Sequence, residues 1–182
     1  AACTARAAGE AEERLGLRRT REDGKFAAGL YSRFLRAQAE LLRHNARPGR
    51  RPLYGNSLAL AQTVQLMVFD EPERAVDALE LLCSELEAAP EAGEGRKRLY
   101  CFYVPFLQPE LDRRFRENGV DLLGSAAFLY TNAVPGFGTG GAAAAWLAGM
   151  TVSGGVRREC AAIAEEMERS GCCAYFTGAF GF

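Results

Sequence analysis

The chain has 182 residues, of which 48% are hydrophobic, 10% aromatic and 25% charged, and its formal net charge is −1. This balance suits one globular core, or one domain with a helical segment before it. There is no basic excess and no run of about 18 apolar residues, so we expect neither a nucleic acid partner nor a membrane span.

Targeting and cysteine usage point to the cytoplasm. The first residues hold no continuous apolar stretch, so we expect no signal peptide. Six cysteines are present and none forms a C-x-x-C spacing, so we expect reduced thiols. The neighbours Cys172 and Cys173 are expected on two faces of one strand. The chain does not begin with methionine, which suggests a fragment or a processed form.

A long helix is predicted near the start of the chain. Thr20 followed by Asp23 approximates a capping box, and apolar residues recur at helical spacing over residues 21–45. The preceding charged residues 10–19 lack apolar spacing and are expected to fray. Residues 45–52 hold two prolines, a glycine and three arginines, which favours a loop.

Two further helices are predicted before a linker at residues 90–95. The first covers about residues 58–69, is uncharged and is expected to be buried. The second starts at Asp70-Glu71-Pro72, where acids and a proline suit a helix N-terminus, and ends near Ala88. Its predicted apolar face contains Ala75, Val76, Leu79, Leu82, Cys83 and Leu86.

Strands and helices alternate in the second half of the chain. Short apolar runs at residues 98–104, at 120–123 and from 172 onward are typical of strands in a parallel sheet. Helices are predicted between them, at 108–117 and 156–170. The first ends at the left-handed stop signal Asn118-Gly119, and the apolar face of the second contains Cys160, Ile163, Ala164 and Met167.

The order of these elements predicts an α/β protein. We expect an N-terminal helical segment, residues 1–95, followed by a flavodoxin-like (Rossmann-like) half-domain, residues 96–182, with a parallel sheet in three layers. We expect this second domain to be incomplete, because the last strand runs directly into the final glycines.

The motifs that suggest chemistry each have a simpler structural interpretation. Gly136, Gly138 and Gly141 form G-x-G-x-x-G, but no acidic residue follows about 20 residues later, so a flexible connection is favoured over a dinucleotide site. His44, the only histidine, is expected to be structural. The aromatic residues at 100–106 favour a strand core over base stacking, and the arginines at 47–51 favour a solvated loop over an anion site.

Residues 17–182 resemble the second half of subunits of the 2-hydroxyacyl-CoA dehydratase and benzoyl-CoA reductase family. The resemblance lies in the order of several short motifs, none of which is specific alone. They are Tyr54-Gly55-Asn56-Ser57-Leu58, then Asp70-Glu71-Pro72-Glu73-Arg74-Ala75 with Leu79, Leu82 and Leu86, the basic residue, strand and proline at 98–105, Glu117-Asn118-Gly119-Val120-Asp121-Leu122-Leu123, and a helix led by Arg157 or Arg158 with the tail 172–182.

The resemblance implies a D-component-like lyase subunit that binds an acyl-CoA, alongside a second dehydratase subunit or in a homo-oligomer. It also implies a [4Fe-4S] cluster held by cysteines on different domains. In this chain Phe182 occupies the position of the family's cluster cysteine, and Cys172-Cys173 replace its Asp-Gly. We therefore expect that this chain alone does not bind the cluster, and that it is catalytically incomplete.

No catalytic residue or metal ligand is assigned from the sequence. The candidate residues of the substrate cleft follow the predicted strands: Pro105, Phe106, Tyr130, Gly136, Gly138, Gly178 and Phe182. Two other functions stay open. One is a non-catalytic scaffold that binds a partner through the helical face between residues 58 and 88, and the other is a nucleotide-binding flavodoxin-like domain that uses the loop at 136–141.

Overall fold

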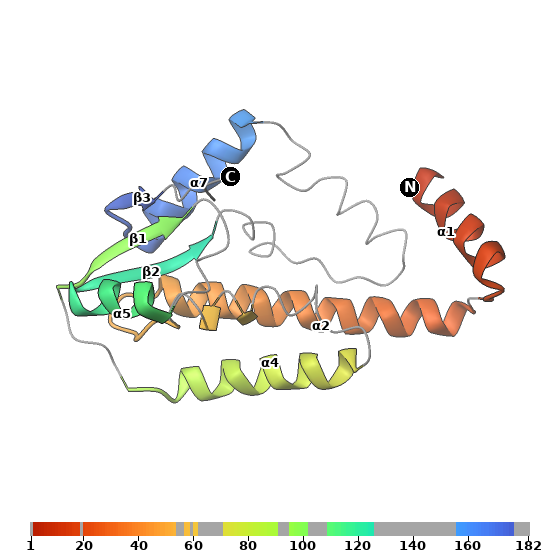
Figure 1. Ribbon diagram of the computed structural model, residues 1–182, viewed down its shortest axis with the longest axis horizontal. Coiled ribbons are helices and arrows are strands. Elements are labelled where there is room, and N and C mark those ends of the chain that lie inside the picture. The colour runs from red at the N-terminus through yellow and green to blue at the C-terminus, as the bar shows by residue number, and fades with distance from the viewer. Residues whose placement is uncertain are drawn as a thin grey trace.

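The computed structural model describes residues 2–18, 20–53, 57–58, 60–61, 71–90, 95–101, 109–125 and 156–176. Over these ranges the protein is mostly helical, with a small parallel sheet of three strands, which is an α/β arrangement in general terms. The long helix α2 runs along the molecule beside α4, and the sheet lies at one end of this helical pair (Figure 1).

Helix α1 covers Ala2–Leu15, so residues 10–15, which were expected to fray, are helical. The prediction was wrong because it relied on apolar spacing, whereas this segment consists mostly of good helix formers such as alanine, glutamate, arginine and leucine. A turn at Gly16 follows, where φ is +64°.

Helix α2 covers Arg21–Ala46 and begins with the predicted capping box. The backbone N–H of Asp23 donates to Thr20 Oγ1 over 3.1 Å, and the N–H of Thr20 donates to Asp23 Oδ2 over 2.8 Å. The Asp23 carboxylate accepts from both the N–H and the hydroxyl of Thr20, and these two hydrogen bonds lower its pKa below the usual value. These contacts satisfy amides that would otherwise lack a partner in the first turn of the helix.

Helix α4 covers Pro72–Glu87, with the expected proline in its first turn. Helices α2 and α4 run in the same direction, because later residues of one contact later residues of the other. Arg33 of α2 binds Asp77 and Glu80, whereas Arg47, just after α2, binds Glu87. The core between them contains Leu35, Leu41, Val76, Leu79 and Cys83, all buried. The predicted apolar face of α4 therefore packs on α2. Of the helix expected before it, the structure describes only residues 57–58 and 60–61, which are helical.

The sheet contains β1 (Lys97–Cys101), β2 (Val120–Ser125) and β3 (Ala174–Phe176), in the order β2-β1-β3. All strand pairs are parallel, as predicted, with Leu99 in register with both Leu122 and Ala174. Helix α5 (Pro109–Glu117) connects β1 to β2 and ends at Gly119, where the predicted left-handed stop has φ of +68°. Cys173 precedes β3, so the vicinal cysteines are not on a described strand.

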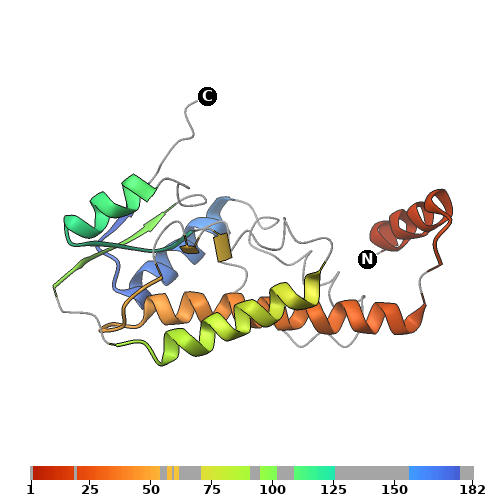
Figure 2. The same ribbon diagram turned by 60° about the horizontal axis from the view of Figure 1, so that its bottom comes forward.

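Helix α7 (Val156–Ser170) leads to β3 and matches its predicted range. Figure 2 draws α5 on one side of the strands, with α2 and α7 on the other. Tyr100 and Leu123 are buried in the α7-side cluster, where Ala162, Ile163 and Met167 pack against them. Cys160 and Ala164 are exposed, so part of the predicted inward face of α7 was wrong. The buried positions are instead the polar Glu166 and Ser170, which bond to each other over 3.1 Å.

Candidate functional site

The carboxyl ends of the three strands meet at one edge of the sheet. Cys101, at the end of β1, is paired with Ser125 of β2 and with Phe176 of β3. The chain leaves β1 toward β2, and later returns past β1 to form β3 on its other side. In open parallel sheets, ligands bind outside the carboxyl ends at such a reversal of strand order. The candidate site is therefore the edge between β1 and β3.

All seven residues predicted for the substrate cleft lie outside the described residues. The strands that precede these residues in the chain are described. Residues 102–108 follow β1, residues 126–155 follow β2, and residues 177–182 follow β3. The structure thus brings the starting points of these three segments together at one edge, while the positions of Pro105, Phe106, Tyr130, Gly136, Gly138, Gly178 and Phe182 stay predictions.

At the opposite, amino-terminal edge of the sheet, two arginines bind neighbouring parts of the fold. Arg96 Nε donates to Asp121 Oδ1 over 2.7 Å, and its Nη2 donates to the carbonyl of Val120 over 3.1 Å. Arg98 Nη2 donates to the carbonyl of Asn45 over 2.6 Å. Both guanidinium groups are thus engaged in joining β1 to its neighbours, which leaves them poorly suited to bind a ligand.

Asn45 joins helix α2 to the sheet. Its side chain is fully buried. Its Nδ2 donates to the carbonyls of Leu53 and Leu123, each over 3.1 Å, and its Oδ1 accepts from the N–H of Leu53 over 2.8 Å. Sequence analysis missed this residue because one asparagine near a helix end gives no distinct signal. Its spacing of seven from buried Gln38, on the same helix face, was the available sign.

The arginines of the loop after α2 bind the end of α4. Arg47 Nη1 contacts Glu87 Oε1 over 2.5 Å, and Arg50 Nη1 donates to the carbonyls of Glu87 and Ala89, each over 3.3 Å. The anion site that was considered at residues 47–51 is therefore unfavourable for two of its three arginines, since their charge and donors are already used within the fold.

His44 is buried, which agrees with the predicted structural role. Its Nε2 lies 2.9 Å from the carbonyl of Arg51 and donates to that oxygen, because a carbonyl can only accept. Its Nδ1 has no hydrogen-bond partner. Within the described residues, neither ring nitrogen is hydrogen-bonded to an acid or a thiol.

The structure describes four free cysteines, Cys83, Cys160, Cys172 and Cys173. Burial raises the pKa of the Cys83 thiol to about 11, and burial likewise raises the pKa of Cys172 to about 11, against the opposing effect of Arg98. Without a bound metal ion, these two thiols are therefore mostly protonated at neutral pH. Within the described ranges, no group of three or more histidine, cysteine or acidic side chains is placed to hold a metal ion.

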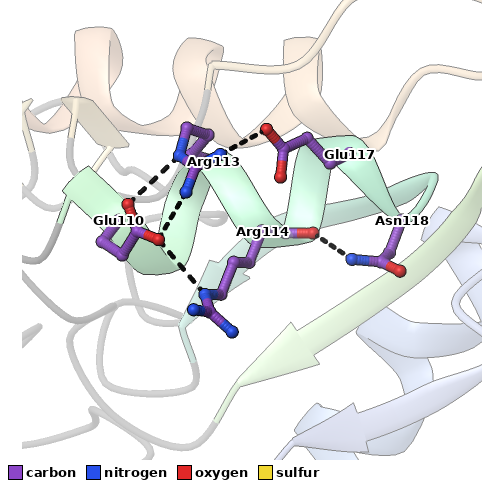
Figure 3. Close-up of polar contacts among 5 residues, drawn as sticks. All are labelled: Glu110, Arg113, Arg114, Glu117 and Asn118. Atoms are coloured by element: carbon purple, nitrogen blue, oxygen red, sulfur yellow. Dashed lines mark hydrogen bonds and ion pairs between the residues drawn. The ribbon is translucent and has the colours of Figure 1, made fainter.

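Helix α5, which follows the first segment of the candidate edge, presents a network of ion pairs to solvent (Figure 3). Arg113 contacts both Glu110 and Glu117, and Arg114 Nε lies 3.2 Å from Glu110. These hydrogen bonds lower the pKa of the Glu110 carboxyl. Exposed pairs of this kind contribute little individually, so this face is best understood as solvated surface.

Comparison with known proteins gives no match, either to protein-family models or to curated proteins. None of the helices within the described ranges is both long enough and apolar enough to cross a membrane.

Proposed function

We propose that this chain is an acyl-CoA-binding domain of the 2-hydroxyacyl-CoA dehydratase type, with its cleft at the carboxyl edge between β1 and β3. The observation that supports this best is the strand order β2-β1-β3. It corresponds to the first three strands of the flavodoxin-like order 2-1-3-4-5, in which the ligand lies at the junction of strands 1 and 3. The predicted cleft residues all follow strands that end at this edge.

In this proposal the domain binds and positions a thioester without completing the dehydration. Phe182 stands where the family has its cluster cysteine, and the described thiols do not form a cluster site. The catalytic residues and the cluster would then belong to another part of the assembly, and this chain contributes one wall of the cleft.

Binding is tested by titrating the protein with a 2-hydroxyacyl-CoA thioester by calorimetry. The single tryptophan, Trp146, lies in the segment after β2, and its fluorescence gives a second readout. We expect saturable binding of the thioester and weaker binding of the free hydroxy acid. Failure of the thioester to bind at millimolar concentration contradicts the proposal.

Matched glycine variants locate the site. We expect Gly138→Ala and Gly178→Ala to weaken thioester binding about tenfold or more, because an added Cβ obstructs close approach of backbone to ligand. The control is Gly24→Ala on α2, where a Cβ meets open space. Equal binding by all three variants places the ligand elsewhere.

A separate measurement tests the prediction that this chain alone does not bind an iron–sulfur cluster. Protein purified without oxygen is analysed for iron and acid-labile sulfide, and we expect far less than one cluster per chain. A stoichiometric cluster on this chain alone contradicts the catalytically incomplete assignment.

A nucleotide-binding flavodoxin-like domain is the second candidate, because FMN occupies the same strand junction in flavodoxin-like folds. Thermal unfolding with and without FMN separates the two. Stabilisation by FMN with no thioester binding favours this second function.

A further inference from the structure

Two adjacent thiols lie in the short link between helix α7 and strand β3. The helix ends in a Schellman motif, in which the N–H of Cys172 donates to the carbonyl of Met167 over 2.9 Å and Gly171 has a φ of +63°. The N–H of Cys173 then donates to the carbonyl of Arg98 over 2.9 Å, directly before the first paired residues of β1 and β3. The two cysteines therefore carry the chain from the helix into the sheet.

The two thiols have different surroundings. Cys172 is half-buried and packs against the buried Tyr100 and Leu123, whereas Cys173 is exposed and its Sγ donates to the Arg98 carbonyl over 3.3 Å. Burial raises the pKa of Cys172 to about 11, the charge of Arg98 opposes this rise, and a charge on Cys173 adds to it. The sulfurs are thus close enough to affect each other, and a reagent in solution reaches Cys173 first.

A disulfide between these neighbours is incompatible with the contacts that they make in the fold. A disulfide requires the two Cβ atoms to lie about 3.8 Å apart with both sulfurs on one side. Here one thiol packs into the core and the other faces solvent. Closing the bond must therefore take Cys172 out of its cluster or Cys173 away from Arg98, and either movement disturbs the link that holds β3 beside β1.

We propose that Cys172 and Cys173 form a redox switch, in which a reversible vicinal disulfide loosens β3 from β1. The oxidant is a small disulfide, such as glutathione disulfide. The thiolate of Cys173 attacks one of its sulfurs, and the glutathione thiolate that leaves takes up a proton. The thiolate of Cys172 then attacks Cys173 Sγ and displaces the second glutathione. Two electrons and two protons thus pass from the protein thiols to the oxidant, which leaves as two glutathione molecules.

The position of the pair favours a switch over a permanent bond. Disulfides that are strained or exposed have higher reduction potentials, and these are the labile and regulatory ones. Within the described residues, β3 pairs with β1 through three residues, so it is an edge strand that can detach without opening the rest of the fold. This inference does not rest on the proposed acyl-CoA site.

Mass spectrometry of the full chain after incubation with excess glutathione disulfide tests bond formation. Trypsin cleaves after Arg169, so one peptide, residues 170–182, contains both thiols and separates them from Cys160. We expect this peptide to lose two hydrogens and to regain them with reduced glutathione. Cys172→Ser should stop at a mixed disulfide between Cys173 and glutathione. The control is Cys160→Ser, which removes an exposed thiol of α7 and should oxidise like the original chain.

Hydrogen exchange of the reduced and oxidised chains tests the structural consequence. We expect the β3 amides to exchange about tenfold faster or more after oxidation, with the amides of α2 and α4 unchanged, because only the edge strand opens. Reduction should restore the slow exchange.

Four results overturn the proposal. The first is the absence of an internal disulfide in the peptide 170–182, and the second is its loss in the Cys160→Ser control. The third is unchanged exchange in β3 after oxidation, or an opening that extends to α2 and α4. The fourth is a mixed disulfide of Cys172→Ser that loosens β3 as much as the vicinal bond does.

Discussion

At the scale of single residues, the buried polar side chains hold the helical part of the chain to the sheet. Asn45 contributes most directly, because one amide satisfies a loop residue and the carbonyl of Leu123 in β2. Arg98 approaches the same place from β1, where it donates to the Asn45 carbonyl. Buried polar groups are costly when they lose their partners, so this contact is sensitive to substitution.

Asn45→Ala is expected to lower the free energy of unfolding by about 3 kcal/mol, since it removes three hydrogen bonds and leaves buried carbonyls without donors. Urea denaturation measures the change. The control is Asn118→Ala, whose exposed amide donates only to Arg114, and for which we expect a loss below about 1 kcal/mol. Similar losses for the two variants would show that Asn45 does not act through its buried contacts.

Thiol reactivity is expected to follow burial and pH. A thiolate is the reactive form, so a pKa raised to about 11 keeps Cys83 and Cys172 largely unreactive at pH 8. Iodoacetamide labelling followed by mass spectrometry should modify the exposed Cys160 and Cys173 first. Labelling of Cys83 and Cys172 should continue to accelerate toward pH 11.

The same pKa shift has a consequence for stability. The thiol pKa is about 11 in the folded state and 9.0 in the unfolded chain, so the folded state binds these protons more tightly. The resulting contribution to the free energy of unfolding is complete below pH 9 and is lost as pH rises toward 11.

Unfolded protein is the control for the labelling experiment, because in denaturant all the cysteines should label at similar rates. Native Cys172 labelling as fast as Cys173 at pH 8 contradicts the burial argument.

At the scale of elements, the turn between α5 and β2 depends on glycine. Gly119 has φ of +68°, and no atom outside its neighbours lies within 4 Å of an added Cβ. Gly119→Ala is therefore expected to cost about 1–2 kcal/mol through backbone strain alone. Gly24→Ala, within α2, should instead stabilise by about 0.5–1 kcal/mol. Thermal unfolding of the two variants measures the difference, and a neutral Gly119→Ala contradicts it.

Local signals predicted most of the described elements. The capping box at Thr20, the proline start of α4 and the stop at Gly119 are chemical features of a few adjacent residues, and each was confirmed. Apolar periodicity did not predict the N-terminal helix α1 or the buried polar positions of α7. The apolar positions of α1 are mostly alanine, which gives a weak signal. On α7 the buried Ser170 donates a hydrogen bond to Glu166, which a hydrophobic pattern does not reveal.

The candidate site was less predictable than the elements. The sequence indicated parallel strands, but the position of β3 beside β1 depends on pairing between distant residues. Engagement of Arg96 and Arg98 within the fold was also not foreseeable from their position at the start of a strand. The cleft residues themselves lie outside the described ranges, and their roles stay predictions.

At the scale of the whole molecule, α2 joins the helical pair to the sheet. It packs against α4 through residues such as Leu35 and Leu41, and it also contacts β2 and α7. A division of the chain into a helical segment and an α/β segment would therefore separate α2 from the strand and helix that it contacts. We expect the two parts to unfold together in one cooperative transition.

Leu35→Ala tests this coupling. The side chain is fully buried in the α2–α4 core, so its truncation should cost about 3 kcal/mol. If unfolding is cooperative, the amides of Leu99 and Tyr100 in β1 lose hydrogen-exchange protection by the same free energy. Unchanged protection in β1 would show that the sheet unfolds independently of the helical pair.

The central position of β1 has a consequence for the order of folding. Its contact with the residues before β3 spans 75 positions, whereas Arg33 reaches Glu80 across 47 positions and β1 reaches β2 across a single short helix. Closing a longer loop costs more entropy. As the chain emerges from the ribosome, α2, α4, β1 and β2 are available long before β3 is synthesised. We therefore expect nascent chains to hold β1 with one open edge, which makes this strand a preferred binding site for chaperones during synthesis.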